Sequence, residues 1–136
     1  MDKDMKELLL KKAVEMRERA YAPYSGFTVG AALLCKNGEI YTGCNIENQS
    51  FTPTVCAERT AVFKAVSDGI REFEAICIAG GKAGTPTRFS PPCGVCRQVL
   101  SEFVHNDFKV LIAISPDEFK EYTFDQIMPL VFDLNA

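Results

Sequence analysis

The chain has 136 residues and a formal net charge of −3 at pH 7, with 47% hydrophobic and 24% charged residues. This length predicts one domain spanning residues 1–136, and the composition excludes a disordered, collagen-like or coiled-coil chain. The slightly acidic balance argues against nucleic acid as a partner, because nucleic-acid binding relies on clustered lysine and arginine. We expect a small-molecule ligand instead.

The N-terminal segment and the cysteines bear on the cellular compartment of the protein. The first twelve residues mix acidic and basic side chains around one short apolar run, 8–10, which is not the pattern of a signal peptide. No apolar run approaches the roughly 18 residues of a membrane-spanning helix. We therefore expect a cytoplasmic protein with no membrane association, whose six cysteines stay reduced and serve in metal binding, catalysis or packing.

The hydrophobic pattern predicts alternating helices and strands. Apolar residues at spacings of three and four predict a helix from Met5 to Ala20. Strands over 29–35 and 40–44 flank the turn sequence 36–38 and predict a hairpin. The later expected elements are a helix over 56–68, a strand over 75–79, a loop over 80–92, a helix over 94–105, a strand over 110–114, a weaker strand over 119–123 and a helical turn over 125–130.

This order of elements predicts an α/β fold. Apolar strands separated by helices are typical of a sheet covered by helices on both faces. We expect a three-layer α-β-α sandwich whose mixed five-stranded sheet opens with the antiparallel hairpin. Beyond the hairpin, the pattern predicts a largely parallel sheet.

Two cysteines open the helix that follows the loop. Cys93 and Cys96 lie in the segment Pro-Cys-Gly-Val-Cys, three residues apart on a first helical turn. Both sulfurs can reach one metal ion there, and the helix N-terminus favours their thiolate forms. A redox pair at a helix start has the same spacing, so this motif alone leaves both interpretations open.

A second motif favours the metal. Cys56 and Glu58 begin the preceding helix, whose N-terminus is expected at the same edge of the sheet. Three thiolates on zinc leave a fourth position for water, and Glu58 can reach that water without binding the metal. If Cys44 were a fourth ligand, the four thiolates would form a closed structural zinc site with no bound water. Glu58 would then have no water to act on, which argues against that arrangement.

The pattern Cys-x-Glu followed by Pro-Cys-x-x-Cys is a known signature of zinc nucleobase deaminases. Four segments extend the likeness: 21–27 (YAPYSGF), 44–48 (CNIEN), 56–61 (CAERTA) and 92–98 (PCGVCRQ). Together they resemble cytidine deaminase, in its small homotetrameric branch with three cysteine ligands.

The resemblance implies a set of roles for individual residues. Cys56, Cys93 and Cys96 would hold one Zn²⁺ per chain, and Glu58 would move protons from the attacking water to the pyrimidine and its leaving amine. Arg59 would donate hydrogen bonds to the ligand sulfurs and withdraw their charge.

The resemblance also implies substrate contacts. Asn45 and Glu47 would hold the ribose hydroxyl, and Phe27 would line the pocket. The Ala57 N–H would contact the pyrimidine carbonyl, and the Pro91 carbonyl the amine. Phe132 would stack on the base in a neighbouring subunit, so that homotetramer formation would complete each active site. The implied activity is hydrolytic deamination of cytidine and 2′-deoxycytidine in pyrimidine salvage.

Alternatives to this activity remain. Phe51 stands where the family usually has tyrosine, and the segment 52–55 does not match closely, which affects substrate choice. A deaminase of a cytosine nucleoside antibiotic such as blasticidin S shares the zinc motifs. A dithiol redox protein or a structural zinc protein built around Cys93 and Cys96 is the alternative from another class.

Overall fold

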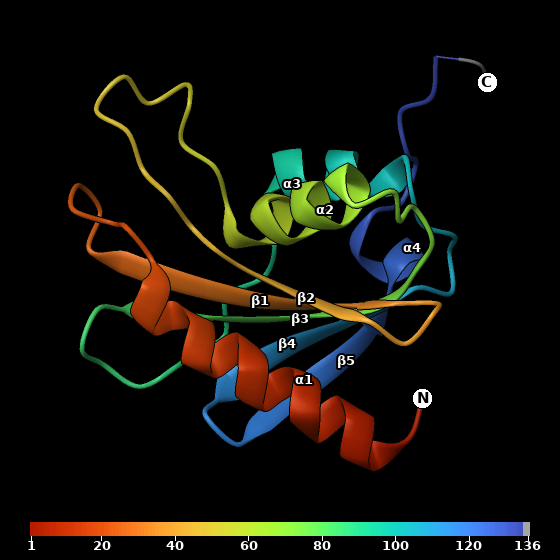
Figure 1. The fold of residues 1–136 in the computed structure, drawn as a ribbon, viewed down its shortest axis with the longest axis horizontal. Coiled ribbons are helices and arrows are strands. Elements are labelled where there is room, and N and C mark those ends of the chain that lie inside the picture. Colours follow the sequence, from red (N-terminus) through yellow and green to blue (C-terminus); the bar gives the residue numbers. More distant parts are fainter. Residues whose placement is uncertain (135–136) are drawn as a thin grey trace.

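A computed structural model describes residues 1–134 of the chain (Figure 1). The elements are α1 (Lys3–Met16), the short 3-10 helix η1 (Arg17–Arg19), β1 (Phe27–Cys35), β2 (Ile40–Cys44), α2 (Ala57–Ser67), β3 (Phe73–Lys82), α3 (Gly94–Ser101), β4 (Lys109–Ser115), β5 (Glu118–Thr123) and α4 (Phe124–Ile127).

The five strands form one mixed sheet in the order β2-β1-β3-β4-β5. β1 pairs antiparallel with both β2 and β3, β3 pairs parallel with β4, and β4 pairs antiparallel with β5. The expected hairpin of β1 and β2 is confirmed. The expectation of a largely parallel sheet is wrong, because β1 inserts between β2 and β3 and the tight turn after β4 returns β5 in the opposite direction.

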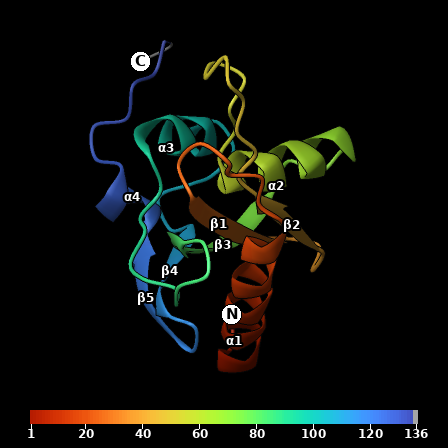
Figure 2. The ribbon, with the colours of Figure 1, turned by 90° about the vertical axis from the view of Figure 1, so that its left-hand side faces the viewer.

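Helices cover both faces of this sheet, so the predicted three layers are confirmed (Figure 2). On one face, α1 packs on the sheet through a cluster that includes Leu9, Ala13, Ala32, Cys77 and Leu111. On the other face, α2 and α3 pack through a larger cluster that includes Val62, Leu100, Leu33, Ile76 and Ile112. Alternate residues of each strand serve the two clusters, as the twofold repeat of a β-strand requires.

Two glycines let the helices approach the sheet closely. A Cβ at Gly30 would lie 2.0 Å from the Ala13 carbonyl oxygen in α1. A Cβ at Gly43 would lie 2.4 Å from the Ala57 carbonyl oxygen at the start of α2. Both contacts are with backbone atoms that cannot move aside easily, so these glycines fix how close α1 and the first turn of α2 lie to the strands.

Several element boundaries differ from the expectation. β3 continues to Lys82, because Gly80 and Gly81 still pair with β1. The first helix tightens into η1 after Met16, which turns Arg17 into the interior, where it is buried. α3 ends at Ser101, short of the expected residue 105. No helix within residues 1–134 is long and apolar enough to cross a membrane.

Candidate metal centre

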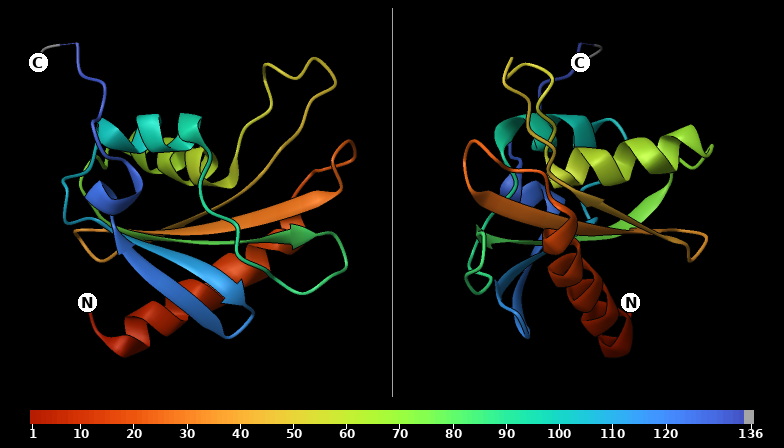
Figure 3. Two further views of the ribbon diagram at one scale, coloured as in Figure 1. Left: turned by 180° about the vertical axis from the view of Figure 1, so that it is seen from behind. Right: turned by 60° about the vertical axis from the view of Figure 1, so that its left-hand side comes forward.

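The N-termini of α2 and α3 meet at one edge of the sheet (Figure 3). β1 is antiparallel to both β2 and β3, so β2 and β3 run in the same direction and end at the same edge. α2 follows β2 and α3 follows β3, which brings their N-cap residues, Cys56 and Cys93, to that edge. Free backbone N–H groups and the positive ends of both helix dipoles therefore surround this point.

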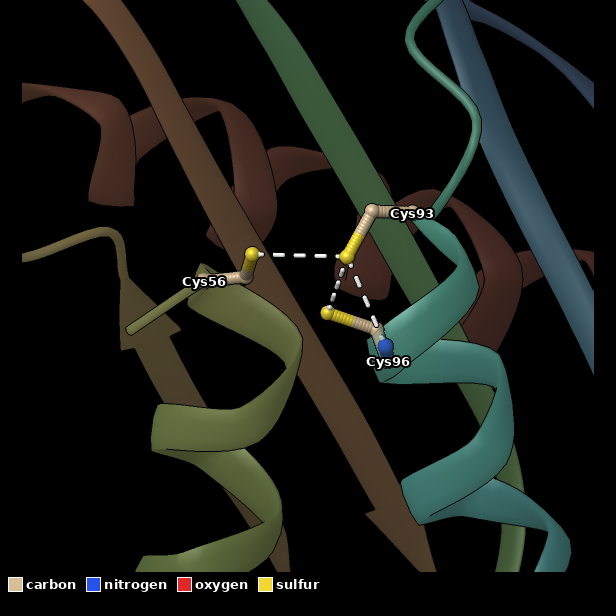
Figure 4. A group of neighbouring side chains, drawn as sticks. All are labelled: Cys56, Cys93 and Cys96. Carbon is tan, nitrogen blue, oxygen red and sulfur yellow. Dashed lines mark hydrogen bonds between the residues drawn. The ribbon is translucent and has the colours of Figure 1, made fainter. Parts of the chain in front are cut away.

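Three cysteine sulfurs converge there (Figure 4). The Sγ atoms of Cys56 and Cys93 are 3.6 Å apart, and those of Cys93 and Cys96 are 3.2 Å apart. Four ligands around zinc at bonds of about 2.3 Å would place sulfurs about 3.8 Å apart. The observed spacing is close to that value and much longer than a disulfide bond of about 2.0 Å. The three thiols therefore fit a zinc ion.

The fourth position of this site is free of cysteine. Among the described residues, Cys56, Cys93 and Cys96 make up the group of side chains that could hold a metal, and Cys44 is not part of it. A closed site of four thiolates is therefore not what the described residues form. All six cysteines are free, and Cys93 is exposed whereas Cys96 is buried.

The surroundings of the Cys56 sulfur favour its negative charge. The Arg59 Nη2 donates to Cys56 Sγ at 3.4 Å, and the Cys96 backbone N–H donates to Cys93 Sγ at 3.4 Å. Hydrogen bonding from the Cys96 thiol, together with Arg59, lowers the pKa of Cys56 to about 5. The Arg59 Nε is buried and finds no hydrogen-bond partner among the described residues. Arg59 contacts the Cys56 sulfur through Nη2, and its role of withdrawing charge from the ligand sulfurs stays a prediction.

Glu58 lies beside the sulfurs in the first turn of α2. Its side chain is 4% exposed, and it lines a cavity of about 260 Å³ together with Cys56 and Cys93. Burial raises the pKa of Glu58 to about 7. A cation bound by the sulfurs would favour the ionised form instead. Larger hollows of about 440 and 450 Å³ lie elsewhere on the described surface, but neither contains the cluster of thiols.

The same cavity brings together five of the residues expected to contact substrate. They are Phe27, Asn45, Glu47, Ala57 and Pro91. They come from the start of β1, the segment after β2, the start of α2 and the loop before α3. The fold therefore brings these distant segments together, and their contacts with substrate stay a prediction.

Asn45 and Glu47 also fix the neighbouring backbone. The Asn45 amide accepts from the Val29 N–H and donates to the Phe27 carbonyl, both at 2.8 Å. Glu47 accepts from the backbone N–H of Tyr24 at 3.0 Å and from the N–H and hydroxyl of Ser25. Those bonds hold segment 21–27 over the cavity. A carboxylate and an amide have further lone pairs, and the amide has one further N–H, so both residues can also bind a ligand.

Two aromatic residues named from the sequence lie outside this cavity. Phe132, in the C-terminal segment, is 65% exposed, and its carbonyl accepts from the Gln98 side chain at 3.5 Å. Phe51 is 74% exposed with φ of 64°, in the loop between β2 and α2. Within one chain, neither residue lines the cavity beside the thiol cluster.

Other cavity residues were not anticipated. Val29 and Ile78 come from buried strands, and Ser90 comes from the loop before α3, with its hydroxyl bonded to the Arg88 carbonyl at 3.0 Å. Ser25 belongs to a motif noted in the sequence, but its bond to Glu47 was not foreseen. The strand residues carry no sequence signal, because their apolar side chains look like ordinary core.

Comparison with known proteins identifies the family. The family described as "Cytidine and deoxycytidylate deaminase zinc-binding region" matches residues 3–112. A cytidine deaminase of Sporosarcina psychrophila is 45% identical over 126 residues, covering 93% of this chain and 90% of that protein. The crystal structure of cytidine deaminase from Burkholderia pseudomallei superposes with a TM-score of 0.84 at 37% identity, covering 97% of this chain and 100% of that one.

A more distant relative is named for a different substrate. A blasticidin-S deaminase of Bacillus cereus is 34% identical over 111 residues, covering 79% of this chain and 78% of that protein. The matches in sequence and in fold agree with the cluster of three thiols beside a buried carboxyl. The chain therefore belongs to the cytidine and deoxycytidylate deaminase family and is a zinc-dependent hydrolytic deaminase with one zinc ion per chain.

Proposed function

We propose that this enzyme deaminates cytidine and 2′-deoxycytidine to uridine and 2′-deoxyuridine, with release of ammonia, in pyrimidine salvage. The observation that carries the proposal is the buried Glu58 carboxyl beside three converging thiols, in a cavity that also contains Asn45 and Glu47. The cytidine deaminase of Sporosarcina psychrophila is 45% identical to this chain, whereas the blasticidin-S deaminase of Bacillus cereus is 34% identical.

Glu58 is the proton carrier in this proposal. Cys56, Cys93 and Cys96 would hold zinc, which supplies a Lewis acid that activates water when it is bound. Glu58 takes a proton from the attacking water and delivers it to the ring nitrogen beside the amine-bearing carbon. It then carries a second proton to the leaving amine, so that a carbon–oxygen bond replaces the carbon–nitrogen bond and ammonia departs. Burial of Glu58 excludes bulk water from these transfers.

The other cavity residues would orient the nucleoside. Asn45 and Glu47 suit a ribose hydroxyl, because together they offer a donor and several acceptors. The Ala57 N–H lies at the first position of α2, where no intrahelical acceptor exists, and is assigned to the pyrimidine carbonyl. The Pro91 carbonyl is assigned to the amine, and Phe27 to the cavity wall.

A neighbouring subunit would complete the site. The cavity of about 260 Å³ is smaller than the roughly 300–1,000 Å³ of typical ligand pockets. Phe132 is exposed and belongs to a C-terminal segment whose Leu130 and Leu134 are also exposed. We propose that this segment packs against another chain in a homotetramer, where Phe132 stacks on the base.

The setting of the enzyme is part of the proposal. We assign it to the cytoplasm, supported by six free cysteines, and we treat residues 1–136 as one deaminase domain, of which residues 135 and 136 lie outside the described part. The net charge of −3 favours a nucleoside over a polynucleotide.

A substrate panel tests the proposal. Ammonia release is measured with cytidine, 2′-deoxycytidine, cytosine, blasticidin S and single-stranded DNA, on protein of measured zinc content. Turnover of the two nucleosides supports it, and turnover of blasticidin S or DNA alone contradicts it. A metal-free protein that cycles a disulfide between Cys93 and Cys96 would indicate the dithiol redox function instead.

A further inference from the structure

Arg17 is a buried cation bound entirely by neutral oxygens. It lies in η1, directly after α1, and is 9% exposed. Its Nε donates to the carbonyl and hydroxyl oxygens of Thr28 at 3.2 and 3.1 Å. Its Nη1 donates to the Thr85 carbonyl and the Thr87 hydroxyl, both at 3.0 Å, and its Nη2 to the Lys82 carbonyl at 3.0 Å. One planar guanidinium therefore joins three separate segments of the chain.

Two of these segments continue into the cavity. Thr28 directly follows Phe27, which lines the cavity. Lys82 ends β3, and Thr85 and Thr87 lie in the loop between β3 and α3, which continues through the cavity residues 90, 91 and 93. In Figures 1 and 2 this loop passes beside the C-terminal end of α1.

The loop is also tied to the cavity by bonds near Arg17. The Ala83 N–H donates to the Gly26 carbonyl at 2.7 Å, and the Arg88 N–H donates to the Gly80 carbonyl at 2.8 Å. The Arg88 guanidinium lies over the Phe27 ring, 5.1 Å from its centroid. The position of the Phe27 ring therefore depends on the same loop that Arg17 holds.

Space for the guanidinium is provided by a glycine. A Cβ at Gly81 would lie 2.9 Å from Arg17 Nη2 and 3.0 Å from the Pro86 carbonyl oxygen. Any larger residue at position 81 would push the guanidinium away from its acceptors, because the backbone oxygen cannot yield. Gly81 and Arg17 thus form one unit, and a change at either one should have the same effect.

We propose that Arg17 is a positioning residue for deamination: its guanidinium holds the β3–α3 loop and Phe27 in the arrangement that binds the pyrimidine. This inference rests on the proposed function for the identity of the substrate. Arg17 does not line the cavity around Glu58 and acts through the residues that do.

The test combines substitution with chemical rescue. In the zinc-loaded full chain, Arg17→Ala should raise the KM for cytidine about tenfold and change kcat little, because a loop that is competent only about a tenth of the time weakens apparent binding by that factor. Added guanidinium chloride at about 0.05 M, far below the molar concentrations that unfold proteins, should restore much of the KM. Arg17→Lys should not, because an ammonium cannot reproduce the planar fork of donors.

Hydrogen exchange provides a readout that does not depend on turnover. The backbone amides of Ala83 and Arg88 should exchange faster in Arg17→Ala and slow again when guanidinium is added. Gly81→Ala should show the same raised KM and the same faster exchange as Arg17→Ala, but added guanidinium should not restore either. This variant replaces Arg17→Ala in the test if Arg17→Ala fails to fold. Leu10→Ala is the stability control, because it weakens the packing of α1 at a position away from the loop. Arg19→Ala is the control for loss of an exposed arginine in η1.

Unchanged KM and unchanged exchange in Arg17→Ala with full zinc would overturn the inference. So would a rise of KM in Leu10→Ala equal to that in Arg17→Ala at matched thermal stability, because the effect would then be general loosening. A wild-type enzyme that does not turn over cytidine would defeat the proposed function, whereas exchange at Ala83 and Arg88 would still decide whether Arg17 holds the loop.

Discussion

Replacing Glu58 by glutamine separates proton transfer from the shape of the site. The two side chains have nearly the same volume, and at 4% exposure the position leaves little room for rearrangement. An amide cannot accept a proton from water and return it to the substrate. Glu58 is not a member of the thiol cluster, so the substitution should leave zinc content intact.

The size of the effect depends on whether another base can act. Glu47 is the other carboxylate of the cavity, and it already accepts from the N–H groups of Tyr24 and Ser25 and from the Ser25 hydroxyl. A general acid or base typically contributes about 10²- to 10⁴-fold in rate. Because Glu58 moves more than one proton and has no substitute, we expect kcat to fall by about 10⁴-fold, equal to about 5.5 kcal/mol.

The pH profile should change in a defined direction. Glu58 must be ionised to take the first proton, and burial raises the pKa of its carboxyl, whereas bound zinc lowers it. The wild-type rate should therefore fall on the acidic side as Glu58 becomes protonated. The residual rate of Glu58→Gln should lack this acidic limb, because the amide does not titrate.

The assay follows cytidine turnover by ammonia release, with zinc measured by elemental analysis and folding by thermal unfolding. Glu15→Gln, which changes an exposed carboxylate of α1, is the matched control and should keep wild-type activity. A Glu58→Gln enzyme with full zinc and activity within tenfold of wild type would refute the role. Loss of zinc from that variant would mean that Glu58 contributes to metal binding.

Three further outcomes are expected at the cysteines and at the C-terminus. Cys56→Ala should lose zinc and activity together, whereas Cys77→Ala should keep both, because Cys77 lies in the core cluster between α1 and the sheet. Zinc retained by Cys56→Ala would contradict the ligand assignment. After zinc is removed by a chelator, iodoacetamide should label Cys93 and Cys56 before Cys35 and Cys77, because burial raises the pKa values of Cys35 and Cys77 to about 11 and about 12. Labelling is followed by mass spectrometry, and equal labelling of all four cysteines would contradict the burial of Cys35 and Cys77. Phe132→Ala should raise the KM for cytidine roughly 5- to 150-fold, as expected for loss of one stacked ring, and should weaken subunit contacts in size-exclusion chromatography; a fully active monomer would contradict both.

The local elements were predictable because they depend on residues close in sequence. The apolar runs in β1 and β4 and the turn at residues 36–38 give the strands and the hairpin directly. The apolar inner faces of α2 and α3 predict these two helices, which begin directly after Cys56 and Cys93. These features depend on hydrophobic periodicity and turn residues, which a single sequence records.

The pairing of distant strands was not predictable in the same way. Whether β3 pairs with β1 or with β2 depends on contacts across the whole fold, and the apolar pattern of β3 fits either neighbour. Burial of Arg17 was missed for a related reason. The hydrophobic pattern predicted one helix through Ala20, with Met16 on its apolar face. Instead the chain tightens into η1 after Met16, and the Arg17 side chain points inward. There it donates to five oxygens of residues 28, 82, 85 and 87.

The site was nevertheless predictable although the sheet was not largely parallel. The convergence of α2 and α3 requires only that the strands before them, β2 and β3, end at the same edge. An antiparallel β1 between the two strands meets that requirement, because two reversals restore the direction. The motifs therefore locate the thiols correctly for any strand order that keeps β2 and β3 pointing the same way, and Gly43 then sets how close the first turn of α2 lies to the sheet. What the motifs do not encode is the support for the cavity wall, which the fold supplies through Arg17 from the opposite layer.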